Sequence, residues 1–223
     1  FSTGATTVLK LDQNSRISLS NNDAGTSNTV FGNIAGDDLA SGGNYNSFFG
    51  HNSGHAVTTG DYNTAFGLNA LDAATVPQRV TAIGTAAMRG AVTADAIGTV
   101  AIGYAALNVL TSGERNLAIG YEALDALTVG DDNIAIGYRA LTNLGTSTFA
   151  NRNIAIGTYA MLSAANNNMS DNVAIGYGAL SQSVHSDGDA NVAIGSYAMS
   201  DLTAGAWAMV GVGDGALRRT NHA

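Results

Sequence analysis

A nine-residue segment recurs along this chain, and that recurrence restricts the fold more than any other feature. The clearest copies are NLAIGYEAL (116–124), NIAIGYRAL (133–141), NIAIGTYAM (153–161), NVAIGYGAL (172–180) and NVAIGSYAM (191–199). Weaker copies are NTVFGNIAG (28–36), NSFFGHNSG (46–54), NTAFGLNAL (63–71) and MVGVGDGAL (209–217). Repeated units of about 20 residues bury their apolar side chains only by stacking on one another. The sequence therefore predicts an array of stacked units.

Every copy has a central glycine, which we call the anchor glycine. Successive anchors are 17 to 20 residues apart. Ala96-Ile97-Gly98 also fits the pattern, but we prefer Gly103 because Ala106 and Leu107 follow it at the usual offsets. The eleven anchors are Gly32, Gly50, Gly67, Gly84, Gly103, Gly120, Gly137, Gly157, Gly176, Gly195 and Gly213.

Large and small residues alternate just before each anchor, as in Asn133-Ile134-Ala135-Ile136. A period of two is typical of a β-strand, and it places the two isoleucines on one face and Asn133 and Ala135 on the other. Gly137 then allows a bend that a side chain would obstruct. The apolar segments are too short for the i, i+3, i+4 spacing of an amphipathic helix. Each repeat is therefore predicted to contain one short strand.

A single repeat cannot be stable alone. Ordering about 18 residues costs about 1–2 kcal/mol each in backbone entropy, whereas four inward apolar side chains return only about 1.5–3 kcal/mol each. Stacking supplies the missing hydrogen bonds and burial. We therefore predict an all-β fold, a β-solenoid or parallel β-roll of about eleven rungs in which like residues stack on like. At about 4.8 Å per rung, the rod would be roughly 50 Å long.

The alanine two residues before the anchor forms a column on the face opposite the isoleucines. A solvent-facing column is normally polar, whereas small residues allow another surface to approach closely. We therefore expect this column to be a subunit interface. The alternative is that it is the tight interior wall of a single-chain solenoid. Its members are Ala82, Ala101, Ala118, Ala135, Ala155, Ala174 and Ala193.

An asparagine stands four residues before most anchors. Its amide could bond along the stack or cap a turn; alternatively, the row could bind a glycan or ice. We favour the ladder of amides. The column comprises Asn28, Asn46, Asn63, Asn116, Asn133, Asn153, Asn172 and Asn191.

Tyrosine follows the anchor directly in four repeats, at Tyr104, Tyr121, Tyr138 and Tyr177. An exposed row of rings could bind the surface of a glycan. The rings could equally lie over neighbouring rungs or a partner chain, and we favour that packing. The longer loops at 142–152, 162–171 and 181–190 are the expected places for receptor contacts, since loops vary without disturbing a stack.

Few residue combinations suggest chemistry. His51 and His55 have a chelating spacing only on a helix, which the pattern does not predict. The acidic turns Asp37-Asp38, Asp131-Asp132 and Asp187-Gly188-Asp189 match no known calcium loop. The segment 211–215 lacks the lysine and the following helix of a phosphate-binding loop. We therefore expect no catalytic residue, no metal and no cofactor.

Charge and composition exclude further classes of function. The net charge of −8 opposes binding to nucleic acid or anionic lipid, which requires a basic surface. No apolar stretch approaches the ~20 residues of a membrane-spanning helix, so we expect no membrane insertion. The chain has no cysteine, which removes disulfides and thiolate metal sites.

The unit N-x-A-I-G-x-x-A-L resembles the head repeats of trimeric autotransporter adhesins, and still more closely the shaft repeats of bacteriophage tail fibres. Residues 10–23 also resemble the segment that leads into such fibres. The resemblance implies a left-handed parallel β-roll that is homotrimeric along its length and projects from a virion or cell surface. The period here is longer than that of the adhesin heads, which predicts larger loops.

These observations predict three regions: an N-terminal lead-in or donated strand (1–27), the repeat domain (28–217) and a C-terminal tail (218–223). Because the chain stops after a complete repeat and solenoids need caps, we expect a longer parent protein or end-to-end stacking.

The expected function is a non-enzymatic rod of a phage tail fibre, located in the virion and supporting attachment to a host glycan or protein receptor. A bacterial surface adhesin or self-assembling extracellular filament is the alternative. A polysaccharide-cleaving tailspike is disfavoured, since the acidic residues show no paired-carboxylate pattern.

Overall fold

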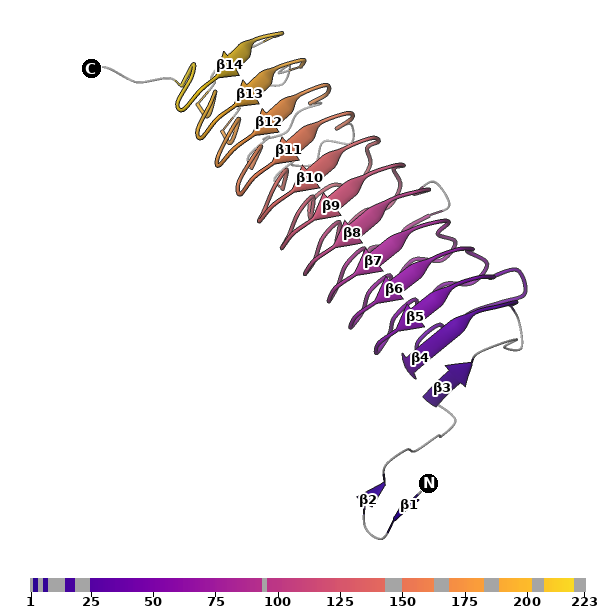
Figure 1. Cartoon of the computed structure of the whole chain (residues 1–223). Coiled ribbons are helices and arrows are strands. Elements are labelled where there is room, and N and C mark those ends of the chain that lie inside the picture. The colour runs from indigo at the N-terminus through magenta and orange to yellow at the C-terminus, as the bar shows by residue number, and fades with distance from the viewer. Residues whose placement is uncertain are drawn as a thin grey trace.

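The computed structural model describes residues 25–93, 96–142, 150–162, 169–182, 189–201 and 207–218, and the backbone of three short strands nearer the N-terminus. This part of the chain is all-β and contains no helix. Figure 1 shows its rungs stacked in chain order along an elongated solenoid. The predicted fold class is therefore confirmed.

Eleven parallel strands form one sheet in strict sequence order. Each of β5–β14 ends at the residue before an anchor glycine, and β4 runs just past its anchor, Gly32. Because β8 ends at Ile102, Gly103 rather than Gly98 is the anchor of its rung. The strands are β4 (Thr29–Asn33), β5 (Ser47–Phe49), β6 (Thr64–Phe66), β7 (Thr81–Ile83), β8 (Val100–Ile102), β9 (Leu117–Ile119), β10 (Ile134–Ile136), β11 (Ile154–Ile156), β12 (Val173–Ile175), β13 (Val192–Ile194) and β14 (Val210–Val212).

The register places equivalent residues of successive repeats side by side. Ala135 pairs with Ala118 on one side and with Ala155 on the other, and Ile136 pairs with Ile119 and Ile156. Equivalent side chains therefore form continuous columns along the solenoid, as the sequence predicts.

Three short strands precede the repeats: β1 (Ser2–Thr3), β2 (Thr6–Thr7) and β3 (Ser15–Ser18). β1 and β2 pair with each other antiparallel. β3 lies antiparallel to β4, with Ser15 opposite Asn33. In this single chain, part of the predicted lead-in segment thus covers the first edge of its own sheet.

The alanine column lies inside the solenoid, so the expected subunit interface there is wrong. Ala82, Ala101, Ala118, Ala135, Ala155, Ala174 and Ala193 are all 0% exposed in the single chain, where they line the core. The isoleucines, expected in the core, lie on the outer face and are half-buried or exposed. The alternative interpretation, an interior wall, is correct.

Small residues face inward because a rung is narrow. The residue four positions after the anchor, such as Leu141, returns into the same interior and fills it. Only a small side chain then fits on the strand opposite. In the rung of β5 the large and small residues are exchanged. The strand carries buried Phe48 instead of alanine, and the opposite wall carries Gly54 instead of leucine. A Cβ at Gly54 would lie 2.6 Å from the Phe48 ring.

Buried asparagines connect the rungs, as expected. The side-chain oxygen of Asn133 accepts the backbone N–H of Asn153, and its amide nitrogen donates to the oxygens of Asn116 and Ala150. Thr99 continues the column with its hydroxyl, which accepts the N–H of Asn116. Each amide therefore satisfies backbone groups of an adjacent rung that water does not reach.

Candidate interaction surface

The outer face of the sheet carries apolar side chains that are half-buried or exposed in every rung. We define the outward face as the first and third residues of strands β4–β14. In the first four rungs the first residue is Thr or Ser, and in the others it is Val, Leu or Ile. The third residue is Phe in three rungs, then Ile, and finally Val. Phe31 and Phe66 are 51% and 57% exposed, which is costly for side chains of this size.

The outward face is long enough to bind a protein. Ten strand-to-strand spacings of about 4.8 Å make it roughly 50 Å long. Soluble monomers rarely expose a continuous apolar patch of several hundred Å² unless it binds something. Single exposed leucines or valines would need no such explanation.

One side of the outward face is bordered by the leading edge, the column five residues before the anchor. In four consecutive rungs this column alternates in charge: Arg115, Asp132, Arg152 and Asp171. Arg115 donates from Nε and Nη2 to the two carboxylate oxygens of Asp132, at 2.6 and 3.0 Å. Arg152 forms the same bidentate pair with Asp171, at 2.6 and 2.9 Å.

These ion pairs favour the charged forms of all four residues. The hydrogen bond from Arg115 lowers the pKa of Asp132, and the one from Arg152 lowers the pKa of Asp171. The same bonds raise the pKa of Arg115 and Arg152. In these four rungs the leading edge is therefore a row of alternating charges at neutral pH. The pairs are solvent-exposed, so they contribute little to the stability of the single chain.

The other side of the outward face is bordered by the trailing edge, the column one or two residues after the anchor. Tyr104, Tyr121 and Tyr138 stack with ring centroids 4.9 and 5.3 Å apart. Tyr159, Tyr177 and Tyr197 continue the row edge to face. The rings thus pack on neighbouring rungs, as we favoured. In the stacked part of the row, the ring faces of Tyr104, Tyr121 and Tyr138 cover one another, which leaves their ring edges and hydroxyls at the surface.

Sequence reasoning missed Tyr159 and Tyr197 as members of this row. They stand two residues after the anchor rather than one, in a left-handed backbone conformation with φ of 59° and 52°. The available signal was the recurrence of Gly-Thr-Tyr-Ala and Gly-Ser-Tyr-Ala where other repeats have Gly-Tyr-x-Ala.

Two tyrosines of the row have raised pKa values. Burial and the neighbouring Glu122 raise the pKa of Tyr121, and a side-chain hydrogen bond with Tyr197 raises that of Tyr177. Both hydroxyls therefore stay protonated at neutral pH and can donate hydrogen bonds.

Some of the candidate histidine and acidic residues have structural partners. His55 Nδ1 lies 3.3 Å from Asp72 Oδ1, and His51 is exposed. The oxygen of Asp131 accepts the backbone N–H of Glu114, one rung earlier, at 2.8 Å. Within the described residues no three His, Asp or Glu side chains are arranged to hold a metal. Residues 143–149, 163–168 and 183–188, where most of the predicted receptor loops and Asp187 lie, are outside the described part of the chain.

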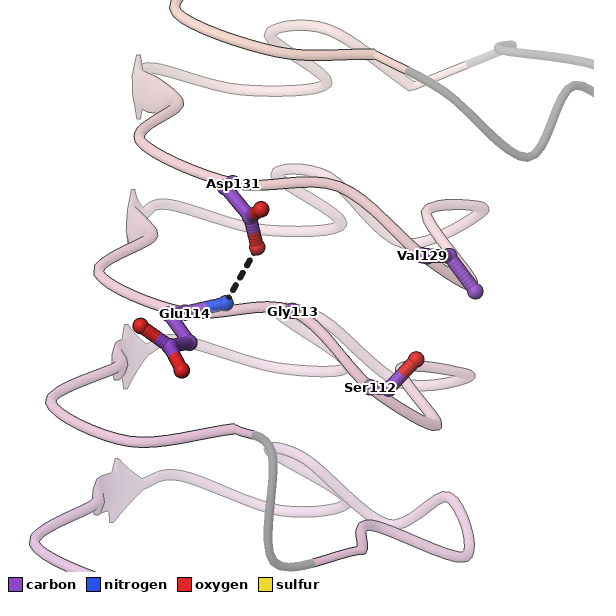
Figure 2. A pocket seen from close by; sticks show the side chains of 5 residues that line it. All are labelled: Ser112, Gly113, Glu114, Val129 and Asp131. Carbon is purple, nitrogen blue, oxygen red and sulfur yellow. Dashed lines mark hydrogen bonds between the residues drawn. The ribbon is translucent and has the colours of Figure 1, made fainter.

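A shallow depression lies between two rungs beside the leading edge. Ser112, Gly113, Glu114, Val129 and Asp131 line it, and Figure 2 shows the Asp131 carboxylate turned toward the Glu114 N–H. Its volume of about 240 Å³ is below the ~300–1,000 Å³ of typical ligand pockets. The outward face with its two edges is therefore the better candidate site.

No family model, curated protein or solved structure matches the chain. In the described part of the chain, no helix has the length and hydropathy needed to cross a membrane.

Proposed function

We propose that this chain is the rigid rod of a homotrimeric phage tail fibre, and that its copies associate through the outward face. The observation that carries the proposal is the row of apolar side chains on the outer face of β4–β14, which are half-buried or exposed in the single chain. The repeat pattern N-x-A-I-G, which resembles tail-fibre shafts, supports the choice of fibre over other rods.

The architecture suits a spacer. Every inner rung is hydrogen-bonded to both neighbouring rungs along its strand and at its corners, for example from Gly137 N–H to the Ile119 oxygen and from Leu141 N–H to the Ala160 oxygen. Bending the rod would break such bonds at several points of one rung. A stiff rod of this kind would hold a host-binding region at a fixed distance from a virion, and we assign it no catalytic role.

A charge placed on the outward face tests the proposal. Ile136 is half-buried at the centre of the face, so Ile136→Glu should leave the single chain folded and separate the copies. The matched control is Val109→Glu, at an apolar residue 39% exposed on the other side of its rung. Light scattering should give three chains for wild type and the control, and one chain for Ile136→Glu. An unchanged mass for Ile136→Glu would contradict an interface here.

Imaging separates the fibre from its alternative. Negative-stain images of a fibre segment should show discrete rods of one length. Polymers that lengthen with concentration would instead support a self-assembling filament, in which ends rather than faces join the copies.

A further inference from the structure

All eight tyrosines of the chain lie on the two edges of the outward face. Tyr45 and Tyr62 stand on the leading edge, in rungs two and three, with rings stacked 4.9 Å apart. The other six form the trailing-edge row. Each of these eight rungs has tyrosine at one edge only, never at both. If the tyrosines only stacked on one another within one chain, there would be no reason for them to lie on one edge in rungs two and three and on the other edge from rung five onward.

The edge opposite a tyrosine is charged in four consecutive rungs. The pairs on one rung are Arg115 with Tyr121, Asp132 with Tyr138, Arg152 with Tyr159, and Asp171 with Tyr177. The stacked rings leave their hydroxyls at the surface. A phenol oxygen accepts hydrogen bonds from an arginine guanidinium, and a phenol O–H donates to a carboxylate. The two edges are therefore chemically complementary.

Within one chain these complementary edges do not meet. Asp132 and Tyr138 are six residues apart across an extended strand, a distance of roughly 15–20 Å. Contact between the two edges requires a second copy of the chain.

The symmetry of association decides which edges meet. Rotation about an axis along the rod keeps rungs level and turns the leading edge of one copy toward the trailing edge of the next. A twofold axis perpendicular to the rod brings like edges together in reversed order. If two copies covered the whole face in that antiparallel way, Arg115, which lies in the sixth of eleven rungs, would face Arg115 of the other copy. Arg79 of one copy would face Arg152 of the other. Such like-charge contacts oppose association.

The area is sufficient for this arrangement. The outward face with both edges is roughly 50 Å long and 20 Å wide, and so presents on the order of 1,000 Å² per copy. In a trimer each copy shares this face between two neighbours, so each interface would bury roughly 1,000 Å² in total, at the lower end of specific interfaces. The apolar columns would form its centre, and the tyrosines and charges would form its rim, as in other protein interfaces.

We propose that copies of this chain associate parallel and in register, with the tyrosine edge of each copy against the charged edge of the next. This rests on the proposed self-association and adds its direction and its pairing. The tyrosine row is thus a specificity element of the assembly. The change of edge between rungs three and five disfavours a copy that is shifted by two to eight rungs in one direction, because that shift would place tyrosines against tyrosines.

Disulfide cross-linking tests the pairing, since the chain has no cysteine of its own. In the double variant Asp132→Cys/Tyr138→Cys the two thiols of one chain are beyond the ~7 Å Cα separation that a disulfide spans. After oxidation, the double variant should run on a non-reducing denaturing gel as a covalent species with the chain number of the native assembly. Each single variant should remain a single chain. The pair Arg115→Cys/Tyr121→Cys, one rung earlier, repeats the test if the first variant folds poorly.

Two outcomes would overturn the pairing. The first is cross-linking of the single variants into dimers, which would show that like edges meet. The second is the absence of cross-links in both double variants while light scattering still reports an oligomer. If the wild-type protein is instead a single chain by light scattering, the proposed self-association itself fails. Val109→Cys, away from both edges, controls for random collision and should not cross-link.

Discussion

The side-chain oxygen of Asn116 accepts the backbone N–H of Asn133, one rung further along the solenoid, at 3.0 Å. The same oxygen accepts the side-chain amide of Asn133 at 3.0 Å. Both residues are buried, so these groups have no access to water. The asparagine column therefore links rungs through side chains at the corner where the strand begins.

Asn133→Ala should destabilise the fold by about 2–6 kcal/mol, because it leaves the Asn153 N–H and the Ala150 oxygen buried without partners, at about 1–3 kcal/mol each. Asn133→Thr should cost less, since Thr99 already serves in this column with a hydroxyl that accepts the Asn116 N–H. Urea midpoints give the ranking. Half-exposed Asn108→Ala is the control, and an equal loss for Asn108 and Asn133 would contradict the ladder.

The repeat allowed the strands, their order and their register to be predicted, but not which face is inside. The alternation in Ile134-Ala135-Ile136 shows that the isoleucines and the alanine lie on opposite faces of the strand. It does not show which of the two faces is buried. The usual rule that large apolar residues are buried fails here because Leu141, from the opposite wall, already occupies the interior. The position of Leu141 opposite the strand depends on how the chain turns back within the rung, which the alternation of residues does not indicate.

The positions of the turns could not be predicted from the sequence either. Leu124, Glu122 and Arg115 all have φ near +55°, a conformation that costs a residue with a side chain roughly 1–2 kcal/mol. Such residues give no signal comparable to glycine. The candidate site could not be predicted for the same reason. The two edges border the outward face only because these turns close each rung.

Ala135 provides a direct test of which face is inside. Ala135→Val should cost about 1–3 kcal/mol by overpacking an interior with no free space, and the loss should appear as a lower urea midpoint. Ile136→Val, at the adjacent outward residue, should change the stability of the separated chain by much less. If Ala135→Val altered only the number of chains in solution, the alanine would be at an interface after all.

Gly137 is required both by its own backbone conformation and by the close approach of the next rung. It has φ of 138°, and a Cβ there would lie 2.6 Å from the Gly157 oxygen. Gly137→Ala therefore combines backbone strain of about 1–3 kcal/mol with a clash against backbone that cannot move aside. Gly213, in the last rung, has φ of 126° but would place its Cβ no closer than 3.9 Å to a neighbour. Gly213→Ala should show the strain alone, so equal thermal midpoints for the two variants would contradict the close approach.

Asp125 and Asp132 should respond to pH with opposite signs. Burial, followed by repulsion from Glu122, raises the pKa of Asp125. A carboxyl with a raised folded pKa binds its proton more tightly in the folded state, so stability is lost as pH rises from the unfolded value of about 3.9 through the folded value. Asp125→Asn should therefore stabilise the protein at pH 7, by less than about 1 kcal/mol because solvent screens a half-exposed group. The gain should vanish below about pH 3.9.

For Asp132 the hydrogen bond from Arg115 lowers the pKa, so its contribution is present above about pH 3.9 and is lost as pH falls through the folded value. Asp132→Asn should therefore weaken the protein at pH 7 and become neutral in acid. Urea midpoints measured for both variants between pH 3 and 7 would show two difference curves of opposite sign. The same sign for both would mean that burial of Asp125 does not outweigh its attraction to Arg139, the third largest contribution to its pKa.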